Sequence, residues 1–195
     1  MSIRVFDKIA TALVVNETIS AEDKEIYEHG LRYITATLLN IATTLIIGFI
    51  FGMVWESILF MASYIPLRTY AGGYHARTPL RCYIFSVILI IAVLLGIKYI
   101  SYNDISLLVI TFISGAIIFI FAPLGDENKP LDALETRIFK KRTRIILFLE
   151  IGLIGVFWFL NWTWISVCMA VSTFVAAVMV IAGIVRRIII GTRIS

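Results

Sequence analysis

Long apolar runs without charges are the feature that most constrains how this chain can fold. The run at 34–53 alone contains 20 consecutive uncharged residues. A helix of about 20 apolar residues crosses the roughly 30 Å of hydrocarbon in a bilayer. Hydrophobic residues make up 60% of the 195 residues, against about 45–50% in soluble domains. The sequence therefore predicts an all-α, polytopic integral membrane protein.

Six runs are predicted to span the membrane as helices within one membrane domain, residues 1–195. The second run is short and contains Pro66, so it either spans with a kink or forms a re-entrant segment. Residues 34–185 form the six-span core, and residues 186–195 form a basic tail. The predicted spans are 34–53, 55–69, 82–100, 105–123, 145–160 and 163–185.

Lys and Arg lie almost entirely on one side of these predicted spans. Of the 17 basic residues, 16 fall in the segments 1–33, 67–81, 124–144 and 186–195, which lie on one side of the six spans, and only Lys98 falls on the other side. Basic residues favour the cytoplasmic side of a membrane. Both termini, these two loops and the start of the third span are therefore expected to face the cytoplasm. The asymmetry also favours an even number of spans, with 55–69 crossing.

The first 33 residues are polar and mixed in charge, and their apolar positions follow a helical spacing. This pattern predicts an amphipathic helix on the membrane surface. Ser20, with Asp23 three residues on, is predicted to cap a second short helix that ends near residue 33. The segment has no signal-peptide core, so insertion is expected to rely on the internal spans. The apolar positions are Ile3, Phe6, Ile9, Ala10 and Leu13.

The stretch 68–82, RTYAGGYHARTPLRC, concentrates polar chemistry in a chain that is otherwise mostly apolar. It contains one of the two His and one of the two Cys residues. Thr78 is a suitable N-cap and Pro79 suits the first helical position, which puts Cys82 in the first turn of the third span. The helix dipole and the neighbouring Arg81 both favour the thiolate form of a cysteine there.

His75 lies seven residues before Cys82. On one straight helix this separation would be about 10.5 Å, too far for contact. Gly72, Gly73 and Pro79 instead predict a bent loop that can fold His75 back onto Cys82. A cysteine activated by a histidine is the minimum needed for nucleophilic acyl transfer. The alternative is that Cys82 is a small buried residue with no catalytic role.

The string R-x-Y-A-G-G-Y-H-A-x-T at 68–78, with a Cys seven residues after the His, resembles the AgrB family. The apolar layout, Ala122-Pro123 and Asn128-Lys129-Pro130 extend the resemblance over most of the chain. The family consists of membrane peptidases that process AgrD, the precursor of bacterial autoinducing peptides in quorum sensing. The resemblance implies a multi-pass thiol protease of the bacterial cell membrane, with an AgrD-like precursor peptide as its partner.

For the reaction, the resemblance implies a cysteine endopeptidase with Cys82 and His75 as catalytic residues. Cys82 would form an acyl-enzyme, and the acyl group would pass to a thiol or hydroxyl of the same peptide to give a thiolactone or lactone. Backbone N–H groups at the start of the third span, or at Gly72 and Gly73, could stabilise the oxyanion. Three arginines suit the binding of an acidic peptide tail: Arg68, Arg77 and Arg81.

Other polar residues have a functional and a plainer interpretation. Glu150 lies in the fifth apolar run, where an ionisable group is a candidate binding residue; alternatively, it reaches water or the basic cluster at 142–144. Lys129 is a candidate substrate-binding residue only through the resemblance. The basic run at 137–144 is explained by topology and by anionic lipid headgroups. Cys168 has no nearby histidine in the sequence and is expected to pack in the sixth span.

The sequence offers no motif for a metal, a cofactor or a nucleic acid. Two distant His and two distant Cys do not suit a zinc site, and a net charge of +4 is too small to argue for nucleic acid. The oligomeric state, including a homodimer, stays open. Two other functions are compatible with the sequence: a peptide exporter without covalent chemistry, and a membrane scaffold that holds a partner on its basic loops.

Overall fold

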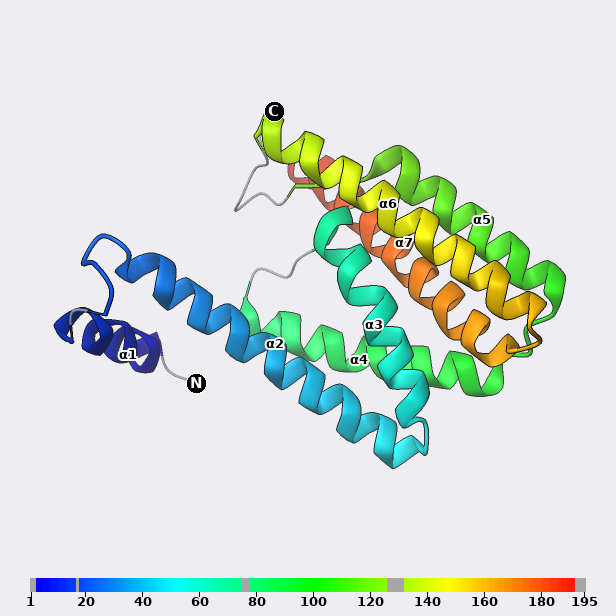
Figure 1. The fold of residues 1–195 in the computed structure, drawn as a ribbon, viewed down its shortest axis with the longest axis horizontal. Coiled ribbons are helices and arrows are strands. Elements are labelled where there is room, and N and C mark those ends of the chain that lie inside the picture. Colours follow the sequence, from blue (N-terminus) through cyan, green and yellow to red (C-terminus); the bar gives the residue numbers. More distant parts are fainter. Residues whose placement is uncertain (1–2, 17, 75–77, 126–131, 192–195) are drawn as a thin grey trace. The chain divides into compact units, whose positions relative to one another are not determined.

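The structure, a computed structural model, describes residues 3–16, 18–74, 78–125 and 132–191. Over these ranges the chain forms seven α-helices and no extended strand (Figure 1). The predicted all-α class is confirmed. The helices are α1 (Ile3–Val15), α2 (Lys24–Phe51), α3 (Val54–Ala71), α4 (Pro79–Tyr99), α5 (Asp104–Phe121), α6 (Ala133–Phe159) and α7 (Thr163–Gly191).

The chain divides into two compact units, residues 1–44 and 45–195. The first unit contains α1 and most of α2. Within it, Lys24 Nζ lies 2.8 Å from Asp7 Oδ1. The second unit contains the last turns of α2 and all of α3 to α7. That the whole chain forms one membrane domain stays a prediction.

The predicted short helix ending near residue 33 is wrong, because α2 continues without a break to Phe51. The predicted capping turn is present, since the Ser20 hydroxyl donates to Asp23 Oδ2 at 2.7 Å. No proline follows this turn before the apolar run. Two threonine hydroxyls near the junction donate to carbonyl oxygens one turn back and so fit within the helix. The polar segment and the first predicted span are therefore one helix.

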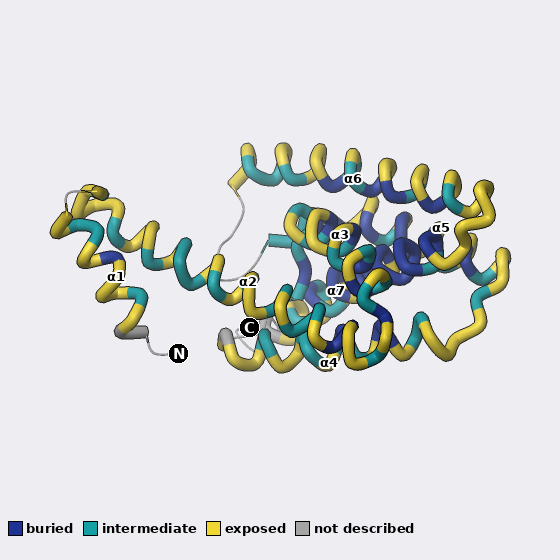
Figure 2. The backbone as a smooth tube through the Cα atoms, turned by 60° about the horizontal axis from the view of Figure 1, so that its bottom comes forward, coloured by how far each residue is buried: buried dark blue, intermediate teal, exposed yellow. Residues whose placement is uncertain are grey.

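Helix α7 is the centre of the second unit. It packs against α3, α5 and α6 and also touches α4. Figure 2 shows its buried residues, in dark blue, among the neighbouring helices. Small side chains on α7 allow these helices to approach closely, as small residues do in membrane proteins. The small buried residues of α7 are Ser166, Ala170, Ser172, Ala176 and Ala177.

Four helices are long and apolar enough to cross a membrane: α2, α4, α5 and α7. This finding supports a membrane protein and agrees with four of the six predicted spans. Helices α3 and α6 lie where the other two spans are predicted. Helix α3 contains Glu56, Pro66 and Arg68, and α6 begins with a basic run and contains Glu150. Their charges lower their mean hydropathy, so the number of six spans stays a prediction.

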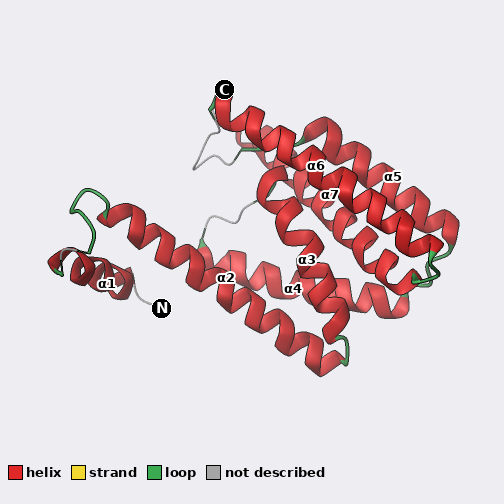
Figure 3. Ribbon diagram, in the orientation of Figure 1, coloured by secondary structure: helices red, strands yellow, loops and turns green. Residues whose placement is uncertain are grey.

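The loops of the second unit gather at two ends, because consecutive helices run in opposite directions (Figure 3). At the Cys82 end, defined by residues 71–74, 78–82 and 122–125, the Leu124 N–H donates to the Ala71 carbonyl oxygen at 2.9 Å. At the tryptophan end, defined by residues 51–56, 97–104 and 158–164, Trp158 Nε1 donates to Asp104 Oδ1 at 2.9 Å. The predicted catalytic segment therefore belongs to the Cys82 end.

Candidate active site

The Gly72-Gly73 pair carries the chain from the end of α3 onto the surface of α7. Their φ angles are +72° and +118°, in the left-handed region that glycine adopts readily. A Cβ atom on Gly73 would lie 2.6 Å from the Met179 carbonyl oxygen, far closer than normal contact. The Gly72 N–H already donates to the Arg68 carbonyl oxygen at 3.2 Å. Backbone packing thus accounts for both glycines, and the Gly72 N–H is engaged rather than free to bind an oxyanion.

Tyr74, the residue before His75, is held by three helices. Its N–H donates to the Met179 carbonyl oxygen of α7 at 2.9 Å. Its carbonyl oxygen accepts a hydrogen bond from Arg68 Nη2 of α3. Its ring packs against Phe85 of α4, with the ring centres 5.7 Å apart, and the Arg186 guanidinium carbon lies 5.4 Å from the ring centre. The backbone is therefore fixed up to the residue that precedes the predicted catalytic histidine.

The start of α4 agrees with its sequence prediction. The Thr78 side chain accepts a hydrogen bond from the Arg81 N–H at 3.3 Å, and Pro79 occupies the first turn. The Cys82 N–H donates to the Thr78 carbonyl oxygen at 3.0 Å, which closes the first helical turn. Cys82 is a free, half-buried thiol, and Arg81 is exposed. The thiol is thus reachable at the positive end of a helix dipole.

Arg68 and Tyr64 of α3 lie beside this turn. Both the Arg68 guanidinium and the Cys82 thiol are close enough to the Tyr64 hydroxyl to act on it electrostatically. Arg68 Nη1 is buried and has no hydrogen-bond partner in the part of the chain that the structure describes. A buried donor without a partner is costly. The cluster therefore contains one buried N–H donor, Arg68 Nη1, that has no partner among the described residues.

Three of the predicted site residues lie outside the described residues: His75, Arg77 and Lys129. The structure brings Arg68, Gly72, Gly73, Arg81 and Cys82 together at the Cys82 end. Their catalytic and binding roles stay predictions.

Glu150 lies apart from this group, in the interior of the helical bundle. It is buried, and its carboxylate accepts hydrogen bonds from Ser63 of α3 at 2.9 Å and from Thr173 of α7 at 3.1 Å. The basic cluster at 142–144 has other neighbours, since Arg142 donates to the Tyr70 hydroxyl at 2.9 Å. The geometry shows Glu150 joining three helices, an arrangement that neither sequence interpretation described.

Sequence reasoning missed the aromatic members of the Cys82 end. Tyr64 interacts with the Arg68 side chain, the Tyr74 carbonyl oxygen accepts a hydrogen bond from it, and the Tyr70 ring lies 5.2 Å from the Arg142 guanidinium carbon. Their spacing at 64, 70 and 74, on both sides of Arg68, was a usable signal. Among the described residues, no group of three or more His, Cys, Asp or Glu side chains could hold a metal ion.

Comparison with known proteins gives a consistent set of relatives. The family model described as "AgrB: Accessory gene regulator B" matches residues 6–191. The "Putative AgrB-like protein" of Clostridium perfringens (strain SM101 / Type A) is 29% identical over 172 residues, which cover 77% of this chain and 78% of that protein. The "Accessory gene regulator protein B" of Staphylococcus aureus (strain bovine RF122 / ET3-1) is 25% identical over 126 residues, which cover 65% of this chain and 67% of that protein. No solved structure matches.

Proposed function

Because the chain belongs to the AgrB family, we propose that it is a membrane cysteine endopeptidase that cleaves an AgrD-like propeptide. Membership supports a role in the accessory gene regulator system, and hence in quorum sensing. The observation that carries the proposal is the placement of Cys82. Its thiol is reachable at the start of α4, beside a segment whose backbone is fixed up to the residue before His75.

In the proposed reaction, the Cys82 sulfur attacks the scissile carbonyl carbon of the propeptide, and His75 takes the thiol proton. The C–N bond then breaks, and His75 returns the proton to the leaving amine. The resulting thioester retains enough reactivity for acyl transfer to a thiol or hydroxyl of the same peptide. This second step closes a thiolactone or lactone ring and regenerates the Cys82 thiol.

Arg68 is proposed to serve the acyl transfer directly. Its Nη1 donor is buried and lacks a partner among the described residues, so an oxyanion or a substrate carboxylate would satisfy it. Its Nη2 donor is already used to hold Tyr74. A charged donor preorganised in this way stabilises negative charge strongly at a site that excludes water.

The proposed setting is the bacterial cell membrane, crossed six times, with both termini and the Cys82 end at the cytoplasmic face. The 16-to-1 distribution of basic residues supports this orientation. Arg77, Arg81 and Lys129 then face an acidic peptide tail from the same side, and the basic run of α6 faces anionic headgroups. A homodimer is compatible with this arrangement.

The test is to incubate the purified protein in lipid with an AgrD-like peptide and to determine the product masses. Cys82→Ala, Cys82→Ser and His75→Ala should each abolish cleavage, and the double variant should be no worse than either single one, because the two residues act as a unit. Cys168→Ala, which removes the other thiol, should cleave normally. A peptide without its ring-closing thiol or hydroxyl should leave an adduct on Cys82 that hydroxylamine removes.

Cleavage by Cys82→Ala would overturn the proposal. If no peptide were cut but peptide transport depended on the chain, an exporter would replace the peptidase.

A further inference from the structure

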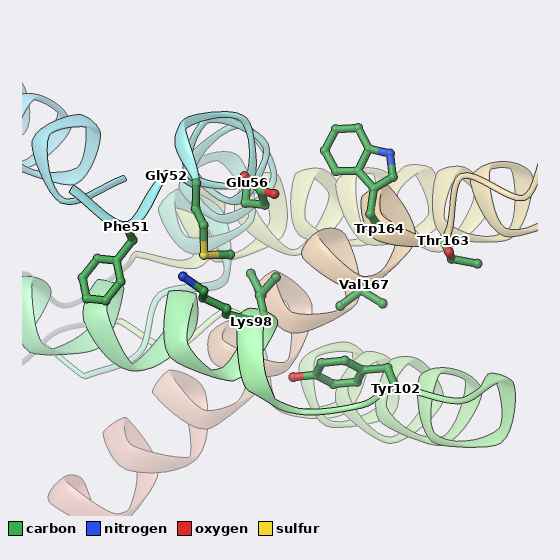
Figure 4. A pocket seen from close by; sticks show the side chains of 10 residues that line it. Phe51, Gly52, Glu56, Lys98, Tyr102, Thr163, Trp164 and Val167 are labelled. Carbon is green, nitrogen blue, oxygen red and sulfur yellow. The ribbon is translucent and has the colours of Figure 1, made fainter. Parts of the chain in front are cut away.

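The tryptophan end of the second unit contains a pocket that the proposed peptidase reaction does not use (Figure 4). Its volume is about 420 Å³, within the range typical of small-molecule sites, about 300–1,000 Å³. Four segments form it: the end of α2, the start of α3, the end of α4 with the turn that follows, and the start of α7. Cys82 lies at the other end of α4.

The pocket presents opposite charges that are not paired with each other. Glu56 of α3 and Lys98 of α4 both line it, and Figure 4 shows their charged groups on different walls. Among the described residues, neither forms an ion pair. Lys98 Nζ lies 5.8 Å from the centre of the neighbouring Tyr99 ring. One anion and one cation at the rim of the same cavity suit a ligand that carries both charges.

The remaining walls are aromatic and hydroxylated. Phe51, Tyr102 and Trp164 supply ring surface, and Thr163 supplies a hydroxyl beside Trp164. Glu56 and Thr163 together provide several hydrogen-bond acceptors. Such acceptors favour a primary ammonium, which can donate three hydrogen bonds, over a trimethylated one, which can donate none.

The tryptophans indicate where this pocket lies relative to lipid. The chain has four Trp residues, and all of them lie at the tryptophan end, with 44–70% of their surface exposed; Trp164 lines the pocket itself. Exposed Trp and Tyr side chains gather at the level of the lipid headgroups. The pocket therefore opens at the depth where phosphate and headgroup amines lie. The tryptophans are Trp55, Trp158, Trp162 and Trp164.

We propose that this pocket binds the headgroup of a phospholipid that carries both a phosphate and a primary ammonium, as phosphatidylethanolamine does. Lys98 pairs with the phosphate, and Glu56 accepts hydrogen bonds from the ammonium. The aromatic side chains cover the headgroup carbons and the start of the glycerol. This binding is independent of peptide cleavage and stands whether or not Cys82 is catalytic.

The experiment is native mass spectrometry of the delipidated, detergent-solubilised full chain. The protein is offered equal amounts of phosphatidylethanolamine and phosphatidylcholine with identical acyl chains, which differ only in methylation of the amine. The wild type should retain phosphatidylethanolamine about tenfold more, the effect of one charge-assisted hydrogen bond. Glu56→Gln should remove this preference, and Lys98→Met should lower the retention of both lipids.

Glu22→Gln is the matched control for Glu56→Gln, since it changes the same residue type at an exposed position that does not line the pocket. It should behave as the wild type. Equal retention of the two lipids by the wild type overturns the proposal, as does a preference that survives Glu56→Gln or a retention that Lys98→Met leaves unchanged. Free phosphoethanolamine should not compete at the concentration of the lipid; if it does, the ligand is a soluble phosphate ester and the lipid assignment is wrong.

Discussion

The two ends of the second unit are held together by different parts of the chain. At the Cys82 end, backbone hydrogen bonds join distant segments: the N–H groups of Leu124 and Tyr74 donate to the carbonyl oxygens of Ala71 and Met179, both at 2.9 Å. At the tryptophan end, a side chain makes the link, from Trp158 to Asp104. Backbone contacts leave a segment little conformational freedom, which suits a catalytic site. Exposed side chains can adapt and suit contact with lipid.

The largest effect is expected from Gly73→Ala, which disrupts the backbone packing of the Cys82 end. The new Cβ would lie 2.6 Å from the Met179 carbonyl oxygen at a φ of +118°, and such a conformation alone costs about 1–3 kcal/mol. Peptide cleavage should fall at least about 100-fold, and the melting temperature should drop. In the control Gly152→Ala, no atom lies within 4 Å of the new Cβ, so the cleavage rate and the melting temperature should be unchanged. Normal cleavage by Gly73→Ala would show that the fixed backbone does not matter.

A smaller effect, on stability alone, is expected from Glu150→Ala in the bundle interior. The change leaves the hydroxyls of Ser63 and Thr173 without their shared acceptor and opens a cavity, at a cost of about 2–4 kcal/mol. Denaturation in detergent should show this loss, and Glu150→Gln, which keeps one acceptor oxygen, should lose less. The folded fraction should cleave peptide at the normal rate. If the folded Glu150→Ala protein did not cleave peptide, Glu150 would instead take part in the reaction.

Arg68→Lys is expected to lower cleavage about tenfold, which corresponds to about 1.4 kcal/mol. Lysine keeps the charge but loses the planar guanidinium, whose Nη2 donates to the Tyr74 carbonyl oxygen and whose Nη1 is proposed to bind the oxyanion or a substrate carboxylate. Single-turnover kinetics should place the loss in the acylation rate. Arg81→Lys is the control, since Arg81 is exposed and its side-chain charge is retained. Cleavage by Arg68→Lys at the wild-type rate would mean that only positive charge matters at this position.

The smallest effect is expected from Trp158→Phe at the tryptophan end. It removes the hydrogen bond to Asp104 and keeps most of the aromatic surface. The free energy of unfolding should therefore fall by only about 0.5–1.5 kcal/mol. Cleavage should be unchanged, because the catalytic segment is held at the other end. Cleavage reduced as strongly as in Arg68→Lys would show that the two ends do not act separately.

The sequence predicted what depends on neighbouring residues. Thr78 and Pro79 define the start of α4, and with it the position of Cys82, through local capping chemistry that needs no tertiary contact. All six apolar runs fall largely within helices, although α2 and α6 begin 10 and 12 residues before the predicted runs. The continuous α2 was not predicted because a capping turn identifies where a helix begins but not where it ends.

Contacts between distant segments could not be predicted from local patterns. Gly73 and Met179 are separated by most of the second unit, and so are Ser63 and Glu150. Single polar residues in apolar runs, such as Ser63 and Thr173, do indicate that a buried partner exists. They do not identify it, since several carboxylates and hydroxyls have the same chemistry.

The role of α7 as the anchor of Tyr74 has a consequence for the biosynthesis of the protein. The ribosome makes Met179 roughly 100 residues after Tyr74, a delay of roughly 5–20 s at typical rates of synthesis. During this interval the Tyr74 N–H lacks its acceptor, and the glycines lack the surface on which they pack. The nascent chain therefore carries Cys82 in an unassembled state. If the proposed peptidase reaction is right, activity is expected only after α7 has been made, and a product truncated before Met179 is expected to be inactive.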